Sequence, residues 1–164
     1  MELVRDWSLV KQIFKEAFST SSHFSVASVN AQGEPHVTPI GSLILGEAGK
    51  GIYFEKFTRQ LPKNYQHSKR VCVMAVNSSQ WFWLKSLLAG RFQRSPALRL
   101  YGEVGELRPA TDKELVLWQK RVHSARFTKG HKLMWREMSM VRDITFDRVE
   151  AVNIGKMTQG LTDK

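Results

Sequence analysis

Cysteine and long apolar runs are scarce in this sequence, and each shortage excludes a class of protein. The chain of 164 residues has one cysteine, Cys72, so it cannot form an internal disulfide or a cysteine-based metal cluster. No apolar stretch approaches the roughly 18 residues that a transmembrane helix needs. The first residues include Glu2 and Asp6 and no long apolar core, which is unlike a signal peptide. We therefore expect a cytoplasmic protein without a membrane partner, in which Cys72 is a small buried side chain.

The familiar motifs of catalysis are also missing. The sequence lacks the G-x-S-x-G nucleophile turn, the H-E-x-x-H zinc helix, the Walker loop and the dinucleotide fingerprint G-x-G-x-x-G. Its five histidines are scattered without helical ligand spacing, so no metal site is predicted. Acids are sparse where bases gather, which argues against paired carboxylates as general acid and base. No residue can be assigned as catalytic from these patterns.

Positive charge is what the sequence has in excess, and it is localised. The formal net charge is +10; residues 56–70 contribute +5 and residues 84–136 contribute +8, while the rest is slightly negative. A field of this sign attracts anionic ligands such as nucleotides, nucleic acid or acidic lipids. The bases of residues 84–136 are typical of a solvated helix face. The functional alternative is that they steer an anionic small-molecule substrate.

Hydrophobic periodicity predicts mainly β structure with peripheral helices. Apolar residues at helical spacing predict an amphipathic helix near the N-terminus, and short turn-bounded apolar segments predict an antiparallel barrel. Thr111 and Glu114 have the spacing of a capping box, which predicts the start of a further helix. The predicted parts of one α+β domain over residues 1–164 are a helix at 7–18, a barrel at 24–108 and 141–155, and a helical insertion at 111–138.

Prolines and glycines predict irregular strands. Pro39 cannot donate a hydrogen bond to a strand ladder, so its strand lies at an edge or contains a bulge. Gly41 lacks a side chain and lets another backbone or a flat ligand come close. Gly102 and Gly105 interrupt a long apolar strand and predict a bend there.

The segment "FTRQLPKN" combines a hydroxyl, a guanidinium, an ammonium and two amides. Pro62 suits the first turn of a short helix, whose free N–H groups favour an anion. Arg59 can bind a phosphate with two parallel hydrogen bonds, and Lys63 can add a point charge. The segment therefore predicts a phosphate cradle, with a solvated basic loop as the alternative. Lys69 and Arg70 follow the helix and are interpreted as the solvated start of the next strand.

The order of these pieces resembles a known family. The motifs "NAQGEPH", "TPIG", "IYFE", "TRQLPKN" and "RVCVMAV" follow one another over residues 24–76 as in the flavin-binding split barrels of the pyridoxamine 5′-phosphate oxidase-like superfamily. The resemblance implies an antiparallel split β-barrel of the FMN-binding type and a homodimer with FMN at its interface. Gln60 stands where the family usually has Lys, and Lys63 can restore that charge. This departure leaves a deazaflavin or haem as alternative cofactors.

The resemblance also implies a set of cofactor-binding residues. The backbone of one strand would lie along the isoalloxazine ring, and the following loop and helix would hold the phosphate. These residues are Val37, Thr38, Pro39, Ile40, Thr58, Arg59, Gln60, Lys63 and Asn64. Trp81 and Trp83 are typical of a core or dimer interface. Their functional alternative is a wall over the flavin ring, supplied across the dimer.

Three hypotheses about function follow. The first is an FMN-dependent oxidoreductase of unknown substrate, in which the flavin carries the redox chemistry. The second is a non-catalytic flavin or haem binding or sensor protein. The third, ranked last, is a basic module that binds nucleic acid through interleaved bases and rings.

Overall fold

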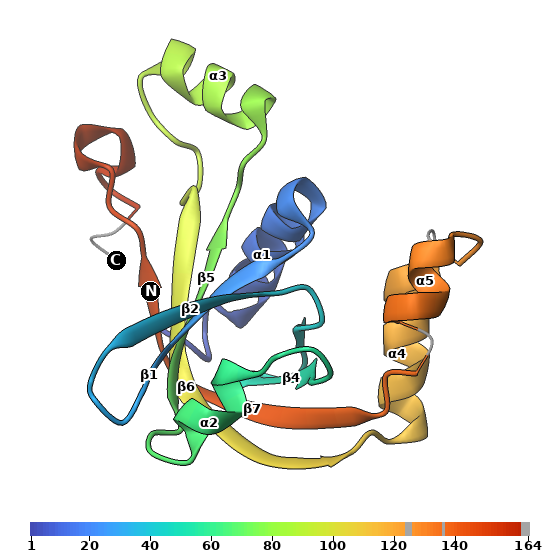
Figure 1. The fold of residues 1–164 in the computed structure, drawn as a ribbon. Helices are drawn as coiled ribbons and strands as arrows, with labels where there is room; N and C mark the ends of the chain where they lie inside the picture. The colour runs from blue at the N-terminus through green and yellow to red at the C-terminus, as the bar shows by residue number, and fades with distance from the viewer. Residues whose placement is uncertain (124–125, 136, 162–164) are drawn as a thin grey trace.

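Seven strands pair into one antiparallel sheet, with helices at its surface and edges (Figure 1). The computed structural model describes residues 1–123, 126–135 and 137–161. In chain order the elements are α1 (Trp7–Ser21), β1 (Phe24–Val29), β2 (Pro35–Ile40), β3 (Ile44–Leu45), β4 (Lys50–Phe54), α2 (Gln60–Tyr65), β5 (Arg70–Val76), α3 (Gln80–Ala89), β6 (Ala97–Pro109), α4 (Asp112–Val122), α5 (Lys129–Met134), β7 (Met140–Ala151) and the 3₁₀ turn η2 (Gly155–Thr158). The predicted mixed α+β architecture is confirmed.

The strand order is β2-β1-β5-β6-β7-β4-β3, so β6 lies at the centre of the sheet. β6 pairs with β5 on one side and with β7 on the other, and its register with β7 shifts at Tyr101/Gly102 and between Val104 and Leu107. The predicted bend is therefore confirmed. A Cβ atom at Gly102 would lie 2.3 Å from the carbonyl oxygen of Thr145. Only glycine lets the two backbones approach this closely at the bend.

β2 is an edge strand, as its proline predicts. Within the described part of the chain it pairs only with β1, and Pro39 lies opposite Ser25 in that ladder. The apolar segment after it breaks at Gly41 instead of continuing as one strand into β3. The backbone at Gly41 passes close to Ser22: a Cβ atom at Gly41 would lie 3.0 Å from the Ser22 carbonyl oxygen. The next residue is held by a hydrogen bond, because the Ser42 hydroxyl donates to the Phe54 carbonyl at 2.7 Å. The break turns the chain away from β1.

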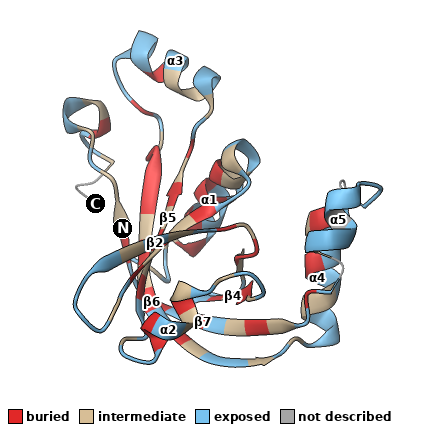
Figure 2. Ribbon diagram, viewed as in Figure 1, coloured by how far each residue is buried: buried red, intermediate tan, exposed pale blue. Residues whose placement is uncertain are grey.

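α1 covers one face of the sheet and forms the main core with it. Its buried residues pack with alternate residues of β1, β5 and β6, and burial is concentrated there in Figure 2. The helix starts at the predicted residue but extends three residues beyond the predicted end at residue 18. It ends at Ser21, because Ser22 takes the left-handed conformation and its N–H donates to the Phe18 carbonyl at 2.8 Å. Cys72 does not join this core. It is half-buried on the opposite face of β5, because Val71 and Val73 occupy the inward positions of the alternating strand, and this corrects the expectation of a buried thiol.

α4 and α5 lie in the connection between β6 and β7 and stand to one side of the sheet (Figure 1). The capping box is confirmed: the Thr111 hydroxyl accepts from the Glu114 N–H, and the Glu114 carboxylate accepts from the Thr111 N–H. Trp118 and Val122 form a second core cluster with Phe54 on β4, and the rings of Trp118 and Phe54 lie 5.2 Å apart. This cluster holds the helices against the end of the sheet.

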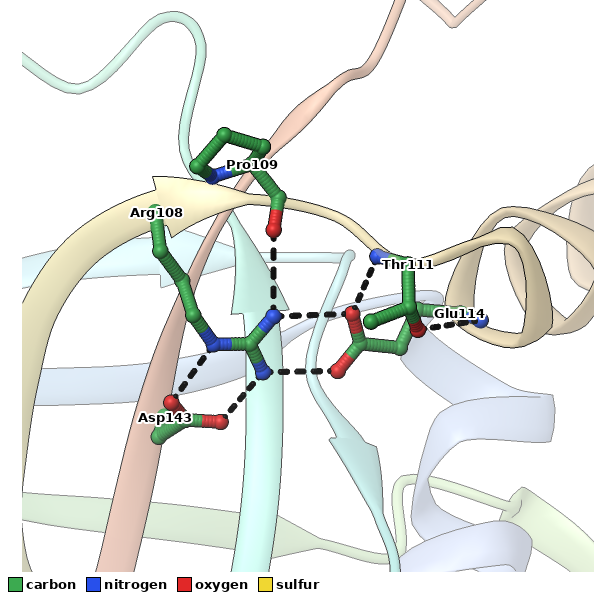
Figure 3. A network of polar contacts seen from close by, with 5 residues as sticks. All are labelled: Arg108, Pro109, Thr111, Glu114 and Asp143. Carbon is green, nitrogen blue, oxygen red and sulfur yellow. Dashed lines mark hydrogen bonds and ion pairs between the residues drawn. The ribbon is translucent and has the colours of Figure 1, made fainter.

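An arginine at the end of β6 fixes the start of α4 (Figure 3). The Arg108 guanidinium donates two parallel hydrogen bonds to Glu114, at 2.7 and 3.0 Å, and two to Asp143 on β7, at 2.6 and 2.8 Å. It also donates to the carbonyl of Pro109 at 3.1 Å. One side chain thus joins β6, β7 and α4.

α3 is a helix that apolar periodicity does not predict, because it is apolar on all sides. Its ends carry recognisable signals: the Ser79 hydroxyl accepts from the Phe82 N–H at 3.3 Å, and Gly90 ends the helix in the left-handed conformation. α3 leaves Trp81 and Leu88 among its exposed side chains and projects from the sheet (Figure 1). Within the described part of the chain, no helix has the length and apolar character that crossing a bilayer requires.

Candidate functional site

A cavity of about 490 Å³ lies between the edge strand β2 and the helices α4 and α5. Residues 39–42 form one wall, together with Thr58 from the loop before α2. His23, just after α1, and Lys56 also contribute. Trp118 and Arg121 of α4 are part of the opposite wall. Segments far apart in the sequence therefore share one hollow.

The cavity brings together three of the predicted cofactor residues: Pro39, Ile40 and Thr58. The Thr58 hydroxyl is buried, yet it has no hydrogen-bond partner among the described residues. A buried hydroxyl without a partner is costly, so such an atom points to a ligand that would pair with it. The backbone of β2 is paired on one side only, which leaves its other edge able to meet a ligand.

Other predicted residues lie outside the cavity wall. Val37 and Thr38 precede it on β2, and the Val37 side chain is 60% exposed. Arg59 and Lys63 are exposed at the start and in the last turn of α2, and neither forms an ion pair with a described residue. The two bases are free to meet an anion at the surface beside the cavity.

The bases set aside from the predicted cradle are engaged elsewhere. Lys69 forms an ion pair with Glu106 on β6, and Arg70 forms one with Asp147 on β7. Nearby carboxylates therefore neutralise Lys69 and Arg70, whereas Arg59 and Lys63 have no such partner among the described residues.

Asn64 and Gln60 form a hydrogen-bonded chain that anchors α2. Asn64 is 1% exposed; its amide nitrogen donates to the Ser28 hydroxyl on β1 at 2.8 Å, and its amide oxygen accepts from Gln60 at 2.8 Å. The structure thus places Asn64 beneath the predicted cradle, where it holds the helix to the sheet. Gln60 is half-buried, and it uses its side-chain amide nitrogen for this hydrogen bond.

A buried ion pair supports α2 from below. Arg142 on β7 donates to Glu55 at 2.8 and 3.1 Å, and the two side chains are 11% and 7% exposed. The Tyr53 hydroxyl donates to Glu55 at 2.7 Å and lies 3.2 Å from the Tyr65 hydroxyl. Burial raises the pKa of Tyr65 to about 12, so both phenols stay protonated at neutral pH. The network is a rigid polar base between β4, β7 and α2.

Trp81 and Trp83 lie on α3, away from the wall of this cavity. Trp81 lines a second cavity of about 380 Å³ together with Lys85. The Trp83 indole donates to the Asn77 carbonyl at 2.7 Å and meets the ring of Phe92 edge-on at 5.1 Å. Trp83 therefore packs locally, and a role for either ring over a flavin requires a second copy of the chain.

The main cavity is electropositive. Lys56 and Arg121 contribute bases to its lining, which contains no aspartate or glutamate among the residues that the structure describes. Arg121 donates to the Leu43 carbonyl and lies 4.0 Å from the centre of the Phe18 ring. Burial lowers the pKa of Arg121 to about 10. No group of three or more metal-ligating side chains was found within residues 1–123, 126–135 and 137–161.

Known structures share this fold. No family model matches the sequence, and no curated protein matches it. An FMN-binding protein of Syntrophomonas wolfei aligns with a TM-score of 0.61 and 11% identity, over 93% of this chain and 95% of that one. A Listeria innocua protein assigned as a pyridoxamine 5′-phosphate oxidase aligns with a TM-score of 0.54 and 14% identity, over 88% and 98%. HutZ, the haem storage protein of Vibrio cholerae, aligns with a TM-score of 0.50 and 14% identity, over 92% and 95%.

The chain has the split-barrel fold of the pyridoxamine 5′-phosphate oxidase-like proteins. The fold expected from the order of sequence motifs is confirmed. At sequence identities of 11–14%, the likeness shows the fold and does not identify a ligand of this chain.

The residues present fit a flavin nucleotide. FMN offers ring carbonyls and a ring N–H to the free edge of β2, hydroxyls to the unpartnered Thr58, and a phosphate to the free bases of α2. The lining without acids is compatible with its negative charge. The cofactor-binding residues assigned from the sequence stay predictions.

Sequence reasoning missed the wall that α4 and α5 provide. Within the predicted helical insertion, Trp118 carries no motif of its own, and Arg121 is only one of the many bases of residues 84–136. One signal was available: Arg121 lies three residues after Trp118, at the border of the apolar face of α4. That signal gives no indication that the helix folds back onto the loop after β2.

Proposed function

We propose that this split barrel binds FMN and acts as an FMN-dependent oxidoreductase. The observation that carries the proposal is the Thr58 hydroxyl, which is buried without a hydrogen-bond partner among the described residues, in a cavity that β2 also lines. In this arrangement the β2 backbone at Pro39 and Ile40 supports the ring. When bound, FMN supplies the electron or hydride transfer.

The phosphate is assigned to the surface of α2. Arg59 would bind it with two parallel hydrogen bonds, and Lys63 would add a second positive charge in place of the lysine that Gln60 replaces. Both bases lack a carboxylate partner among the described residues, so no existing ion pair has to break on binding. Asn64 contributes by holding α2 in position through Ser28.

A homodimer with the flavin at its interface is part of the proposal. Val29 on β1 and Val37 on β2 are exposed apolar residues, at 41% and 60%. Covering them with a second chain would bury apolar surface and shield the ring from water. Sedimentation with and without FMN tests this: a dimer is expected, and a monomer at micromolar FMN would contradict it.

The cofactor itself is tested by spectroscopy on the purified protein. A flavin absorption spectrum, FMN as the released mass and bleaching by NADPH without oxygen are expected. If the released ligand has the mass of a deazaflavin, the cofactor is a deazaflavin and not FMN. A flavin that no donor reduces would support a binding protein without turnover. A colourless protein that gains no FMN on titration would refute the proposal.

Arg59→Ala tests the phosphate assignment. The change removes a charge-assisted contact to the phosphate, so FMN affinity should fall about ten- to a hundredfold. Riboflavin lacks the phosphate, and its affinity should stay the same. Arg70→Ala is the matched control, because Arg70 is a nearby base that already has a carboxylate partner. Equal losses for FMN and riboflavin would contradict the role of Arg59.

Haem binding is the second candidate, and one histidine favours it. His23 lines the cavity, and its Nδ1 lies 2.7 Å from the Ser21 carbonyl oxygen. Because a carbonyl only accepts hydrogen bonds, Nδ1 carries the proton and Nε2 keeps its lone pair for a metal. Titration with haem, followed through its Soret band, tests this candidate. A shifted band that His23→Ala abolishes would favour haem over FMN.

A further inference from the structure

One arginine in the cavity has no carboxylate partner. Five of the arginines that the structure describes are half-buried, and four of them form ion pairs with carboxylates. These pairs are Arg94 with Glu16, Arg99 with Glu150, Arg108 with Glu114 and Arg142 with Glu55. The fifth is Arg121, which has no carboxylate of a described residue within 4 Å.

The guanidinium of Arg121 has spare hydrogen-bonding capacity. An arginine carries five N–H donors, and the bond from Nη1 to the Leu43 carbonyl is its only hydrogen bond to a described residue. The Phe18 ring covers one face of the guanidinium at 4.0 Å from its centre, which orients the group. Withdrawing a cation from water without an anion is unfavourable, so the position favours a ligand that brings the anion.

The surfaces around Arg121 are apolar and aromatic. Trp118, Val122, Met134 and Met138 form the same side of the cavity. Trp118 is fixed because its indole donates to the Trp135 carbonyl at 3.2 Å. A ligand here would therefore meet one oriented positive group and a hydrophobic surface.

We propose that the α4 side of the cavity binds an aromatic carboxylate, with the carboxylate on Arg121 and the ring system against Trp118. The site faces residues 39–42 across the same cavity. If FMN lies along β2, as the proposed function states, the bound acid faces the flavin and is its substrate. The binding site itself stands without that function.

The probe is 2-naphthoate, which joins two fused rings to one carboxylate, and its neutral control is 2-naphthamide. Calorimetric titration of the full chain, without FMN and with saturating FMN, measures both. The acid should bind about ten- to a hundredfold more tightly than the amide, the usual range for a charge-assisted pair. Equal affinity for the acid and the amide would overturn the proposal.

Arg121→Gln and Lys120→Gln form a matched pair on one helix, because Lys120 is exposed. The Arg121 variant should bind the acid no better than the amide, whereas the Lys120 variant should keep the full preference. An equal loss in both variants would indicate a general positive field and would refute the site. If Arg121→Gln fails to fold, Arg121→Lys replaces it; this variant keeps the charge and should keep part of the preference for the acid. The comparison of 2-naphthoate with 2-naphthamide on the wild type still tests the proposal.

FMN titration of the same proteins separates the two proposals. Arg121→Gln should bind FMN like the wild type, and saturating FMN should leave 2-naphthoate binding intact. A parallel loss of FMN, or competition between FMN and the acid, would place Arg121 in the flavin site and overturn its assignment to a second ligand. A wild type that prefers the acid but binds no FMN would refute the proposed function alone.

Discussion

Glu114→Gln tests whether the arginine junction in Figure 3 holds α4 to the sheet. Glutamine keeps both capping-box hydrogen bonds to Thr111 and removes the charge that faces Arg108. The Arg108 guanidinium, helped by the Thr111 N–H, lowers the pKa of Glu114 from its ordinary 4.5 to about 2. The carboxylate is 15% exposed, so solvent screens this pair only partly.

The magnitude follows from that pKa. At about 1.4 kcal/mol for each unit of pKa, the charged form of Glu114 stabilises the fold by at most about 3–4 kcal/mol. A folded-state pKa below the unfolded one gives stability that is fully present above about pH 4.5 and is lost as pH falls through about 2. The variant should therefore be less stable than the wild type by about 1–3 kcal/mol at pH 7, and the difference should shrink toward pH 2.

Urea unfolding at pH 7, 5, 3 and 2, followed by tryptophan fluorescence, measures the difference directly. Glu106→Gln is the matched control, because Glu106 belongs to an ion pair at the surface and such pairs contribute little. A stability difference between Glu114→Gln and the wild type that stays the same at pH 7 and pH 2 would refute the reasoning.

Three further changes probe the frame of the site, each measured by urea unfolding at pH 7. Asn64→Ala leaves partners on α2 and β1 unpaired and should cost about 1–3 kcal/mol; no measurable loss would contradict its anchoring role. Gly102→Ala should leave little folded protein, because the new Cβ would lie 2.3 Å from a carbonyl oxygen of β7, whereas Gly105→Ala, with its closest contact at 3.5 Å, should fold normally. Arg142→Met leaves Glu55 buried without its partner and should cost about 3–5 kcal/mol, part of which Glu55→Leu should restore.

The sequence was a reliable guide where a local physical signal exists. The capping residues Thr111 and Glu114 place the start of α4 correctly, and Pro39 places its strand at an edge. Gly102 marks the bend of β6, since glycine is required wherever two backbones touch. α3 escaped prediction because a helix that is apolar all round has no amphipathic period, and only its capping residues mark it.

The candidate site was half accessible to sequence reasoning. Thr58 and the strand around Pro39 are close in sequence and were found together. Arg121 was not found, because its contact with Leu43 depends on where the connection between β6 and β7 places α4. Neighbouring bases such as Lys120 and Arg121 look equivalent in a sequence, and only the packing of the helix separates the exposed one from the half-buried one.

The pairing of β4 has a consequence for how the protein is made. Apart from the two-residue β3, the sheet partner of β4 is β7, where Ile52 lies opposite Asp143. On the ribosome, β4 therefore emerges with only the short β3 beside it, and its pairing with β7 must wait until β7 has been synthesised. Joining segments so distant in sequence slows folding and leaves strand edges open to aggregation meanwhile. A nascent chain released before β7 would lack the main sheet partner of β4, and it would lack Asp143, one of the two carboxylates that Arg108 binds.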